Sequence, residues 1–153
     1  MQLRAAVAAD IDALLALERE CITPPWSEGA MLGEILHDDT VFLVAAQQLN
    51  GETAPSDAPL CGFAVLRKIG DEAELFRIAT SSAHRREGVA AHLLHKILTD
   101  AKTAGVRSVF LEVRASNSAA IALYERFGFV NVGHRKSYYA APVEDASVMR
   151  LAI

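Results

Sequence analysis

The chain has 153 residues, of which 52% are hydrophobic and 22% are charged, and its formal net charge is −4. This length supports one hydrophobic core, so a single domain over residues 1–153 is expected. The composition excludes a largely disordered chain. The acidic balance argues against binding to nucleic-acid backbones, which requires a basic surface, but suits a cationic partner such as an amine or a basic peptide.

The N-terminal segment has no apolar stretch behind basic residues, and no run approaches the roughly 18 apolar residues of a membrane span. We therefore expect a cytoplasmic protein that does not bind membranes. The two cysteines, Cys21 and Cys61, form no C-x-x-C motif. Because a chain of this size does not need a disulfide, both are expected to be small buried side chains.

The first half of the chain predicts four strands and two helices. Residues 2–7 are expected to form the first strand. Apolar residues then recur at helical spacing from Asp10, a candidate N-cap, and this helix must end before Pro24. Ser27 is a candidate cap for the second helix, and segment 48–59, rich in turn-forming residues, is expected to be a surface loop. The remaining strands are expected at residues 41–46, 60–69 and 72–80.

The second half predicts two more helices and three more strands. A polar loop at 81–88 leads into a helix that has one apolar face and ends near Gly105. Asn117 begins another helix, and Gly128 ends it. The expected strands span residues 108–113, 130–139 and 147–153. About seven strands and four helices in mixed order predict an α/β domain with a mixed, mostly antiparallel sheet.

The segment Arg85-Arg86-Glu87-Gly88-Val89-Ala90 lies where a loop enters a helix. The free N–H groups and the dipole of a helix N-terminus can bind phosphate, and small residues such as Gly88 and Ala90 allow a close approach. Arg85 and Arg86 add positive charge. Taken alone this pattern is weak, because a glycine can simply begin a helix beside solvated arginines.

The strand at 72–80 ends at this loop, so backbone groups of Ile78–Thr80 would lie beside a ligand arm that extends from the phosphate. Pantetheine carries two amides and can pair with such an edge like an added strand. The chain lacks the Gly-Lys-Ser/Thr sequence of a P-loop. Coenzyme A is therefore a better candidate than ATP.

Glu112 is a lone carboxylate in an otherwise apolar strand, and a buried acid is costly unless it is paired or functional. A salt bridge with Arg114 or another neighbour is the simpler alternative. Asn117 can serve as a helix cap, and Tyr124 follows it by about two turns on the same helix face. A tyrosine alone would more often be a packing residue, whereas a tyrosine facing an asparagine suggests a site.

These segments resemble the GNAT superfamily of acetyltransferases, whose Q/R-x-x-G-x-G/A acyl-CoA signature fits residues 85–90. Further blocks resemble the bacterial ribosomal-protein-alanine N-acetyltransferases. They are Pro25-Trp26-Ser27, Leu75-Phe76-Arg77-Ile78-Ala79, residues 111–117, residues 120–125, Gly128-Phe129, Tyr138-Tyr139 and Glu144-Asp145-Ala146. The chain departs from that pattern at Arg85 and Ala90, in its long 48–59 loop, and in the short connection at 140–143, which lacks a glycine.

The resemblance implies direct acetyl transfer in a ternary complex, with Glu112 as general base and Tyr124 as general acid. The cosubstrate would be acetyl-CoA, with no metal, and the acceptor would be the N-terminal alanine of a small-subunit ribosomal protein. Trp26, Tyr138 and Tyr139 are candidates for lining the peptide groove, with core packing as an equal alternative. The implied cofactor-binding residues are Ile78, Ala79, Thr80, Arg85, Arg86, Glu87, Gly88, Val89, Ala90, Ala91 and Asn117.

Other chemistries find less support in the sequence. His92 and His95 lie three residues apart on a helix, but no further ligand has useful spacing for a metal. There is no G-x-S-x-G motif for a nucleophilic hydrolase. Two alternatives stay open: an acetyltransferase that acts on a small-molecule amine or a lysine side chain, and a non-catalytic regulator that binds acyl-CoA.

Overall fold

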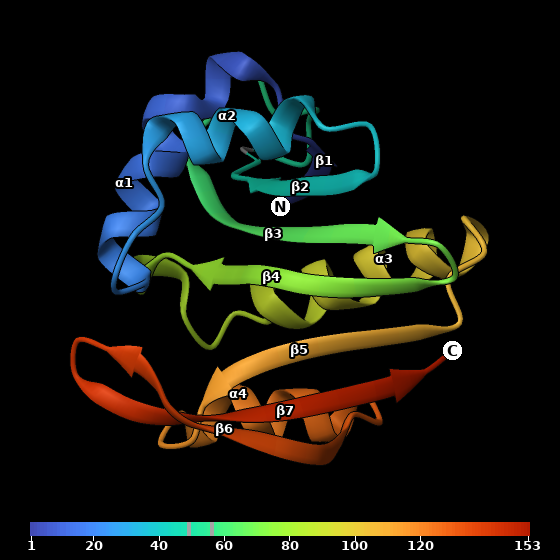
Figure 1. The fold of residues 1–153 in the computed structure, drawn as a ribbon. Coiled ribbons are helices and arrows are strands. Elements are labelled where there is room, and N and C mark those ends of the chain that lie inside the picture. The colour runs from blue at the N-terminus through green and yellow to red at the C-terminus, as the bar shows by residue number, and fades with distance from the viewer. Residues whose placement is uncertain (49, 56) are drawn as a thin grey trace.

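The computed structural model describes residues 1–48, 50–55 and 57–153. These residues form seven strands, four α-helices and two short 3₁₀ helices (Figure 1). In chain order the elements are β1 (Gln2–Ala5), η1 (Ala8–Asp10), α1 (Ile11–Cys21), α2 (Glu28–Leu36), β2 (Thr40–Ala46), β3 (Leu60–Ile69), β4 (Glu72–Thr80), η2 (Ser82–His84), α3 (Val89–Thr103), β5 (Ser108–Arg114), α4 (Ser118–Arg126), β6 (Val130–Ala140) and β7 (Val143–Ala152).

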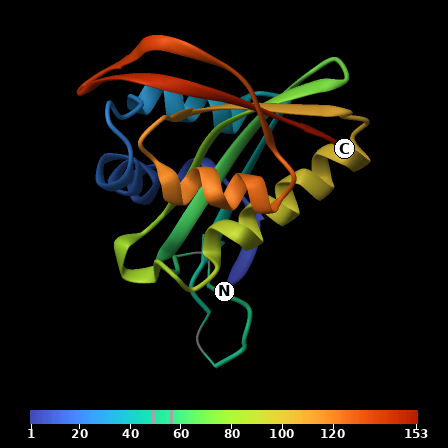
Figure 2. The same ribbon diagram turned by 90° about the horizontal axis from the view of Figure 1, so that it is seen from below.

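The strands form one mixed sheet in the order β1-β2-β3-β4-β5-β7-β6. Every neighbouring pair is antiparallel except β4 and β5, which run parallel. Helices α1 and α2 cover one face of the N-terminal strands, and α3 and α4 lie on the opposite face (Figures 1 and 2). The predicted fold class, an α/β domain with a mixed and mostly antiparallel sheet, is confirmed.

Strand β3 shows why the sheet needs helices on both sides. Phe63 and Val65 pack among the side chains of α1 and α2, whereas Ala64 and Leu66 pack against α3. All four side chains are fully buried. Because side chains alternate between the two faces of a strand, a central strand buried on both faces reads as a continuous apolar run.

Two of the predicted helix caps are present. The Ser27 hydroxyl accepts a hydrogen bond from the Ala30 N–H at 3.1 Å, and the Asn117 side chain accepts one from the Ala120 N–H at 3.2 Å. Each bond satisfies one of the free N–H groups at a helix N-terminus. The local sequence therefore fixes the starts of α2 and α4.

Asp10 is the N-cap residue of α1, as predicted, but its side chain makes no capping hydrogen bond. Its carboxylate forms an ion pair with Arg4 at 2.8 Å and also accepts the Val7 N–H at 2.9 Å. The Arg4 guanidinium holds the pKa of this carboxyl below its usual range. Because these contacts turn the chain into η1, strand β1 ends at Ala5 and not at Val7.

The start of β7 also differs from the prediction, whereas the loop between β2 and β3 lies where it was expected. Strand β7 begins at Val143, not at Ser147, because residues 143–146 pair with the far end of β6 despite their two acidic side chains. The segment at 48–59 joins β2 to β3 as expected, and its residues Leu49 and Ser56 lie outside the described residues. Among the helices described, none is both long and apolar enough to cross a membrane.

Strands β4 and β5 separate partway along their length (Figure 1). Their parallel pairing ends where Leu75 faces Leu111, although both strands continue beyond these residues. A β-bulge lies at this point, since Val65 pairs with Arg77 and Leu66 pairs with Leu75, which leaves Phe76 as an extra residue. A bulge bends its strand. The bulge therefore turns β4 away from β5 and leaves their facing edges unpaired.

Candidate active site

Three adjoining hollows follow the separation of β4 and β5. The outer hollow has a volume of about 660 Å³ and is lined by Trp26, Glu34, Glu74, Phe76, Arg77, Glu112, Tyr138 and Tyr139, among others. The channel, of about 160 Å³, is lined by residues that include Arg77, Ile78, Glu112, Arg114, Asn117, Tyr124 and Tyr139. The inner groove, of about 440 Å³, is lined by residues that include Ile78, Ala79, Thr80, Arg85, Ala90, Asn117 and Tyr124.

The three hollows adjoin one another, since neighbouring hollows share lining residues, and together they are called the passage. Arg77, Glu112 and Tyr139 line both the outer hollow and the channel. Asn117 and Tyr124 line both the channel and the inner groove. A ligand in the groove and a second ligand in the outer hollow can therefore meet in the channel, between Glu112 and Tyr124.

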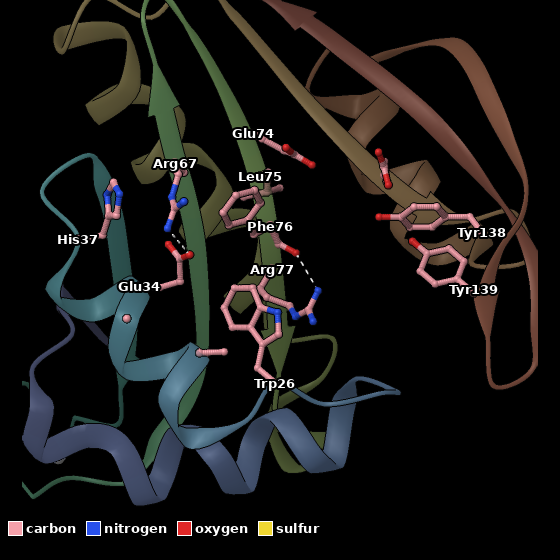
Figure 3. A pocket seen from close by; sticks show the side chains of 13 residues that line it. Trp26, Glu34, His37, Arg67, Glu74, Leu75, Phe76, Arg77, Tyr138 and Tyr139 are labelled. Carbon is pink, nitrogen blue, oxygen red and sulfur yellow. Dashed lines mark hydrogen bonds and ion pairs between the residues drawn. The ribbon is translucent and has the colours of Figure 1, made fainter.

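Aromatic side chains stand on both sides of the outer hollow (Figure 3). Trp26 packs edge to face on Phe76, with 6.3 Å between the ring centroids. On the other side Tyr138 and Tyr139 pack edge to face at 5.0 Å. The three aromatic residues predicted for a peptide groove, Trp26, Tyr138 and Tyr139, thus line one hollow although the first two lie 112 positions apart in the sequence.

The wall on the β4 side is built around the buried carboxylate of Glu18. One of its oxygens, Oε1, accepts both the Arg77 Nε–H and the Trp26 backbone N–H, each at 3.0 Å. The Arg77 guanidinium then lies with Cζ 4.3 Å from the centroid of the Trp26 ring. Because of the bulge, Phe76 and Arg77 both reach this wall instead of alternating between the two faces.

Glu112 projects from β5 where the outer hollow joins the channel. Its side chain is 16% exposed and pairs with the Arg135 Nε at 2.9 Å. A hydrogen bond with Glu112 also raises the pKa of the Tyr138 hydroxyl. The sequence suggested Arg114 as the simplest partner, but Arg114 pairs with Glu144 at 3.6 Å.

Tyr124 is both a packing residue and a residue of the passage. It is 6% exposed, and its ring centroid lies 5.7 Å from that of Phe129. Burial, with a smaller contribution from Tyr139, raises the pKa of its hydroxyl. Tyr124 is therefore protonated at neutral pH and can donate a proton or a hydrogen bond.

The loop before α3, the cradle predicted for a phosphate, turns sharply into the helix. Arg86 and Gly88 both have positive φ, +65° and +78°, and Gly88 is the N-cap of α3. Only Gly adopts such a conformation without strain, so Gly88 is fixed by the backbone turn. Arg85 and Ala90 face the inner groove.

Other residues predicted to bind a cofactor do not line the inner groove with their side chains. Glu87 pairs with His84 at 2.9 Å, and Val89 is buried in the core. Arg86, Gly88 and Ala91 belong to the turn and to the first turn of α3. Their backbone N–H groups are the part that a phosphate could contact, because the first N–H groups of a helix lack partners within it.

Cys21 lines both the channel and the inner groove, and its thiol donates to the Thr80 carbonyl at 3.3 Å. Burial, and then the nearby Glu20 carboxylate, raise the pKa of this thiol. Cys21 is thus a neutral thiol at neutral pH and a poor nucleophile. Cys61 is buried, as predicted, whereas the same prediction is wrong for Cys21, which is only partly buried because it lines the channel; both cysteines are free.

Some residues of the passage were not expected from the sequence. Glu74 lies on the wall of the outer hollow (Figure 3), where burial and then Glu112 raise its pKa. Arg77, which lines the outer hollow and the channel, was also missed, although it is a charged residue within a largely apolar strand. Glu18 and Arg135, the partners of Arg77 and Glu112, were missed as well. Within the described ranges, no group of three or more His, Cys, Asp or Glu side chains could hold a metal.

The model of the acetyltransferase (GNAT) family matches residues 11–129. This stretch begins with α1 and contains β4, β5, the loop before α3 and both Glu112 and Tyr124.

Curated proteins with similar sequences carry a more specific name. A Salmonella typhimurium protein named ribosomal protein bS18-alanine N-acetyltransferase is 36% identical over 146 residues, which cover 94% of this chain and 92% of that protein. The Escherichia coli K12 protein of the same name is 35% identical over the same coverage. The chain therefore aligns with these relatives over nearly their full length.

Solved structures with similar folds agree with the sequence matches. The crystal structure of the Escherichia coli ribosomal-protein-S18-alanine N-acetyltransferase has a TM-score of 0.85 and 32% identity, and the match covers 99% of this chain and 93% of that one. Ard1 from Thermoplasma volcanium has a TM-score of 0.84 at 24% identity, covering 99% and 97%. The second match shows a common fold only.

Proposed function

Because this chain belongs to the acetyltransferase (GNAT) family, we propose that it acetylates the N-terminal α-amino group of a protein. The chain is an N-acetyltransferase that uses acetyl-CoA, and the resemblance noted in its sequence is confirmed. The names of two relatives specify an alanine of ribosomal protein bS18. We infer that the N-terminal alanine of bS18 is also the acceptor for this chain. The row of adjoining hollows whose lining includes Glu112 and Tyr124 carries the proposal.

The inner groove and the free edge of β4 fit acetyl-CoA. The N–H groups at the start of α3, from Val89 to Ala91, would bind the pyrophosphate, and Arg85 would add positive charge. The pantetheine arm would pair with the backbone of Ile78–Thr80, which β5 leaves free. Asn117 uses its side-chain oxygen for the Ala120 N–H, so its amide NH₂ group remains to donate to this arm.

We assign to Glu112 the role of taking a proton from the acceptor amine. An α-amino group has a pKa of roughly 8, so most acceptor molecules arrive protonated at neutral pH. Arg135, the resting partner of Glu112, is 60% exposed. An incoming ammonium can therefore replace Arg135 without leaving a buried guanidinium unpaired, after which Glu112 accepts the proton directly or through a water.

Tyr124 acts at the other end of the transfer. A backbone N–H of Ile78–Thr80 would stabilise the negative charge that develops on the thioester oxygen. The raised pKa of Tyr124 keeps its proton available for the departing thiolate. Since Cys21 is also held as a thiol, the reaction would be a direct transfer in a ternary complex without a covalent enzyme intermediate.

The outer hollow would hold the first residues of the acceptor peptide. Trp26, Tyr138 and Tyr139 offer flat surfaces, and the carboxylates of Glu74 and Glu112 stand in the lining, whereas Glu34 is paired with Arg67. This lining and the net charge of −4 suit a basic peptide. Ribosomal proteins are synthesised in the cytoplasm, so we place the enzyme there as well.

Thiol release from acetyl-CoA with a panel of acceptors tests this function. The panel contains basic peptides with a free N-terminal alanine, the same peptides with a blocked N-terminus, a blocked peptide with an internal lysine, and polyamines. We expect turnover only with the free N-termini. Glu112→Gln and Tyr124→Phe should each lower kcat by about a hundredfold, and Glu125→Gln, which changes an exposed carboxylate on α4, should leave it unchanged.

The alternatives give different results in the same assay. Turnover of polyamines or of the blocked lysine peptide would overturn the acceptor and keep the acetyl transfer. Tight binding of acetyl-CoA with no turnover of any acceptor would point to a regulator that binds acyl-CoA. Equal rates for Glu112→Gln and the unmodified enzyme would remove Glu112 from the role of base.

A further inference from the structure

The last residue of β5, Arg114, joins two loops that are distant in the sequence. Its Nη2 donates to the Thr23 carbonyl at 3.0 Å, in the connection between α1 and α2. Its Nη1 and Nη2 also donate to the carbonyls of Pro142 and Ala141, at 3.0 and 3.3 Å, in the turn between β6 and β7. Among the described residues, Arg114 is the one side chain that hydrogen-bonds to both loops.

The same guanidinium also holds an aromatic residue of the passage. Its Cζ lies 4.3 Å from the centroid of the Tyr139 ring, and Glu144 supplies a carboxylate 3.6 Å from Nη1. Glu144 in turn accepts the Ser116 N–H at 2.7 Å, which lies just beyond the end of β5. The planar, always charged guanidinium is suited to such a set of contacts, because its donors point in fixed directions.

The two loops bound the point where the outer hollow meets the channel. Thr23 and Tyr139 both line the channel, and Tyr139 also lines the outer hollow. Arg114 lines the channel but not the outer hollow, so it acts on an acceptor residue held in the outer hollow only through Tyr139 and the loop of Thr23. The spacing of the two loops sets the width of the opening at this junction.

We propose that Arg114 is a positioning residue that fixes the α1–α2 loop and the β6–β7 hairpin relative to each other and thereby sets the opening through which an acceptor amine enters the channel. This inference rests on the proposed function only in treating the outer hollow as the acceptor side. It predicts that a change at Arg114 alters the KM for the acceptor. The KM for acetyl-CoA should change little, because the proposed groove for this cosubstrate is lined by Thr80, Arg85 and Ala90. A small misplacement of reacting groups is enough to slow such a reaction strongly.

The test compares Arg114→Lys with Arg150→Lys. Arg150 is a matched control because it also lies near an aromatic ring, with Cζ 5.9 Å from the Phe110 centroid, on the neighbouring strand β7. Lysine keeps the charge but cannot reach two loops with a planar fork of donors. The acceptor used is whichever member of the panel the unmodified enzyme turns over fastest, so an error in the proposed acceptor does not affect the comparison.

We expect Arg114→Lys to raise the acceptor KM by about tenfold or more and to leave the KM for acetyl-CoA within about twofold. Hydrogen–deuterium exchange should become faster in residues 22–27 and 138–145 together, in this variant only. Arg150→Lys should change none of these quantities. The exchange measurement needs no acceptor, so it decides the inference even if the enzyme acetylates nothing in the panel.

Two results would overturn the inference. One is unchanged exchange in both loops of Arg114→Lys. The other is an equal rise in both KM values, which would indicate a general loss of structure; a thermal midpoint close to that of the unmodified protein excludes simple unfolding as the cause.

Discussion

Two arginines stack on aromatic rings, one on each side of the passage, and they are held in different ways. Arg77 and Arg114 lie at the same distance, 4.3 Å, from the rings of Trp26 and Tyr139. The partner of Arg77 is Glu18, which is fully buried. The partner of Arg114 is Glu144, which keeps 19% of its side chain exposed and lies 3.6 Å away.

This difference in the burial of the two carboxylates determines how firmly each wall of the passage is held. Glu18 ties α1, β4 and the Trp26 loop together inside the core, so the wall on the β4 side cannot move without exposing a buried charge. Arg114 instead holds loop carbonyls and a hairpin near the surface. The β4 wall is therefore part of the stable fold, and the hairpin wall can be altered at little cost in stability.

The largest expected effect follows from removal of the buried carboxylate. Glu18→Ala should lower the free energy of unfolding by about 3 kcal/mol, because it leaves the Arg77 guanidinium uncompensated. This value is at the low end for a buried pair, since Arg77 keeps 22% of its side chain exposed and can be partly hydrated. Urea unfolding measures the change. Glu125→Ala, an exposed change on α4, should stay within about 0.5 kcal/mol, and an equal loss in both variants would contradict the comparison.

Removal of the Trp26 ring or of the Tyr139 ring should lower stability by smaller amounts, and the two losses should be unequal. Trp26→Ala should cost about 2 kcal/mol of stability, because Trp26 packs on Phe76 at the edge of the core. Tyr139→Ala should cost less than about 1 kcal/mol, because its ring lies on the hairpin. Both should lower kcat/KM for the acceptor. Equal losses of stability would show that the two walls are equally structural.

The smallest expected effect is the part of the pH dependence of stability that comes from Glu144, on the hairpin wall. Hydrogen bonds from Ser116, with smaller help from Arg114, lower the pKa of Glu144 in the folded protein. A carboxyl with a depressed pKa contributes stability above its unfolded pKa, about 4.3, and that contribution is lost as the pH falls through the folded pKa.

Glu144→Gln should therefore lose less stability than the unmodified protein between pH 6 and pH 3, when both are followed by thermal unfolding. Asp10 and Glu20, whose pKa values are also lowered, contribute equally to both proteins and cancel in the difference. Parallel acid curves for the two proteins would show that Glu144 does not support the hairpin.

The sequence predicted the features that depend on neighbouring residues. The caps at Ser27 and Asn117 follow from a side chain and an N–H three residues apart, and both are present. Apolar periodicity likewise located the four helices and seven strands. Asp10 is the predicted N-cap residue of α1, but its carboxylate pairs with Arg4, which precedes the helix, and does not bond to the N–H groups of α1.

The features that depend on distant residues could not be predicted. The bulge at Phe76 exists only in the pairing of β3 with β4, and the pair of Glu18 with Arg77 spans 59 positions. Glu112 was identified as a candidate from its isolation in an apolar strand. Its partner Arg135 was not, because the register of β6 on β7 decides which of several basic residues comes near it.

The separation of β4 from β5 divides the sheet into two halves, and the ribosome synthesises one half before the other. Strands β1–β4 lie within residues 2–80 and strands β5–β7 within residues 108–152, so each half of the sheet is one continuous stretch of chain. The ribosome releases the first half several seconds earlier at about 5–20 residues per second. The cradle before α3 can then form first, whereas Glu112, Tyr124 and the hairpin tyrosines arrive with the second half. Because Asn117 and Tyr124 also line the inner groove, the binding site for the acetyl donor is completed only with this second half, at the same stage of synthesis as the acceptor site.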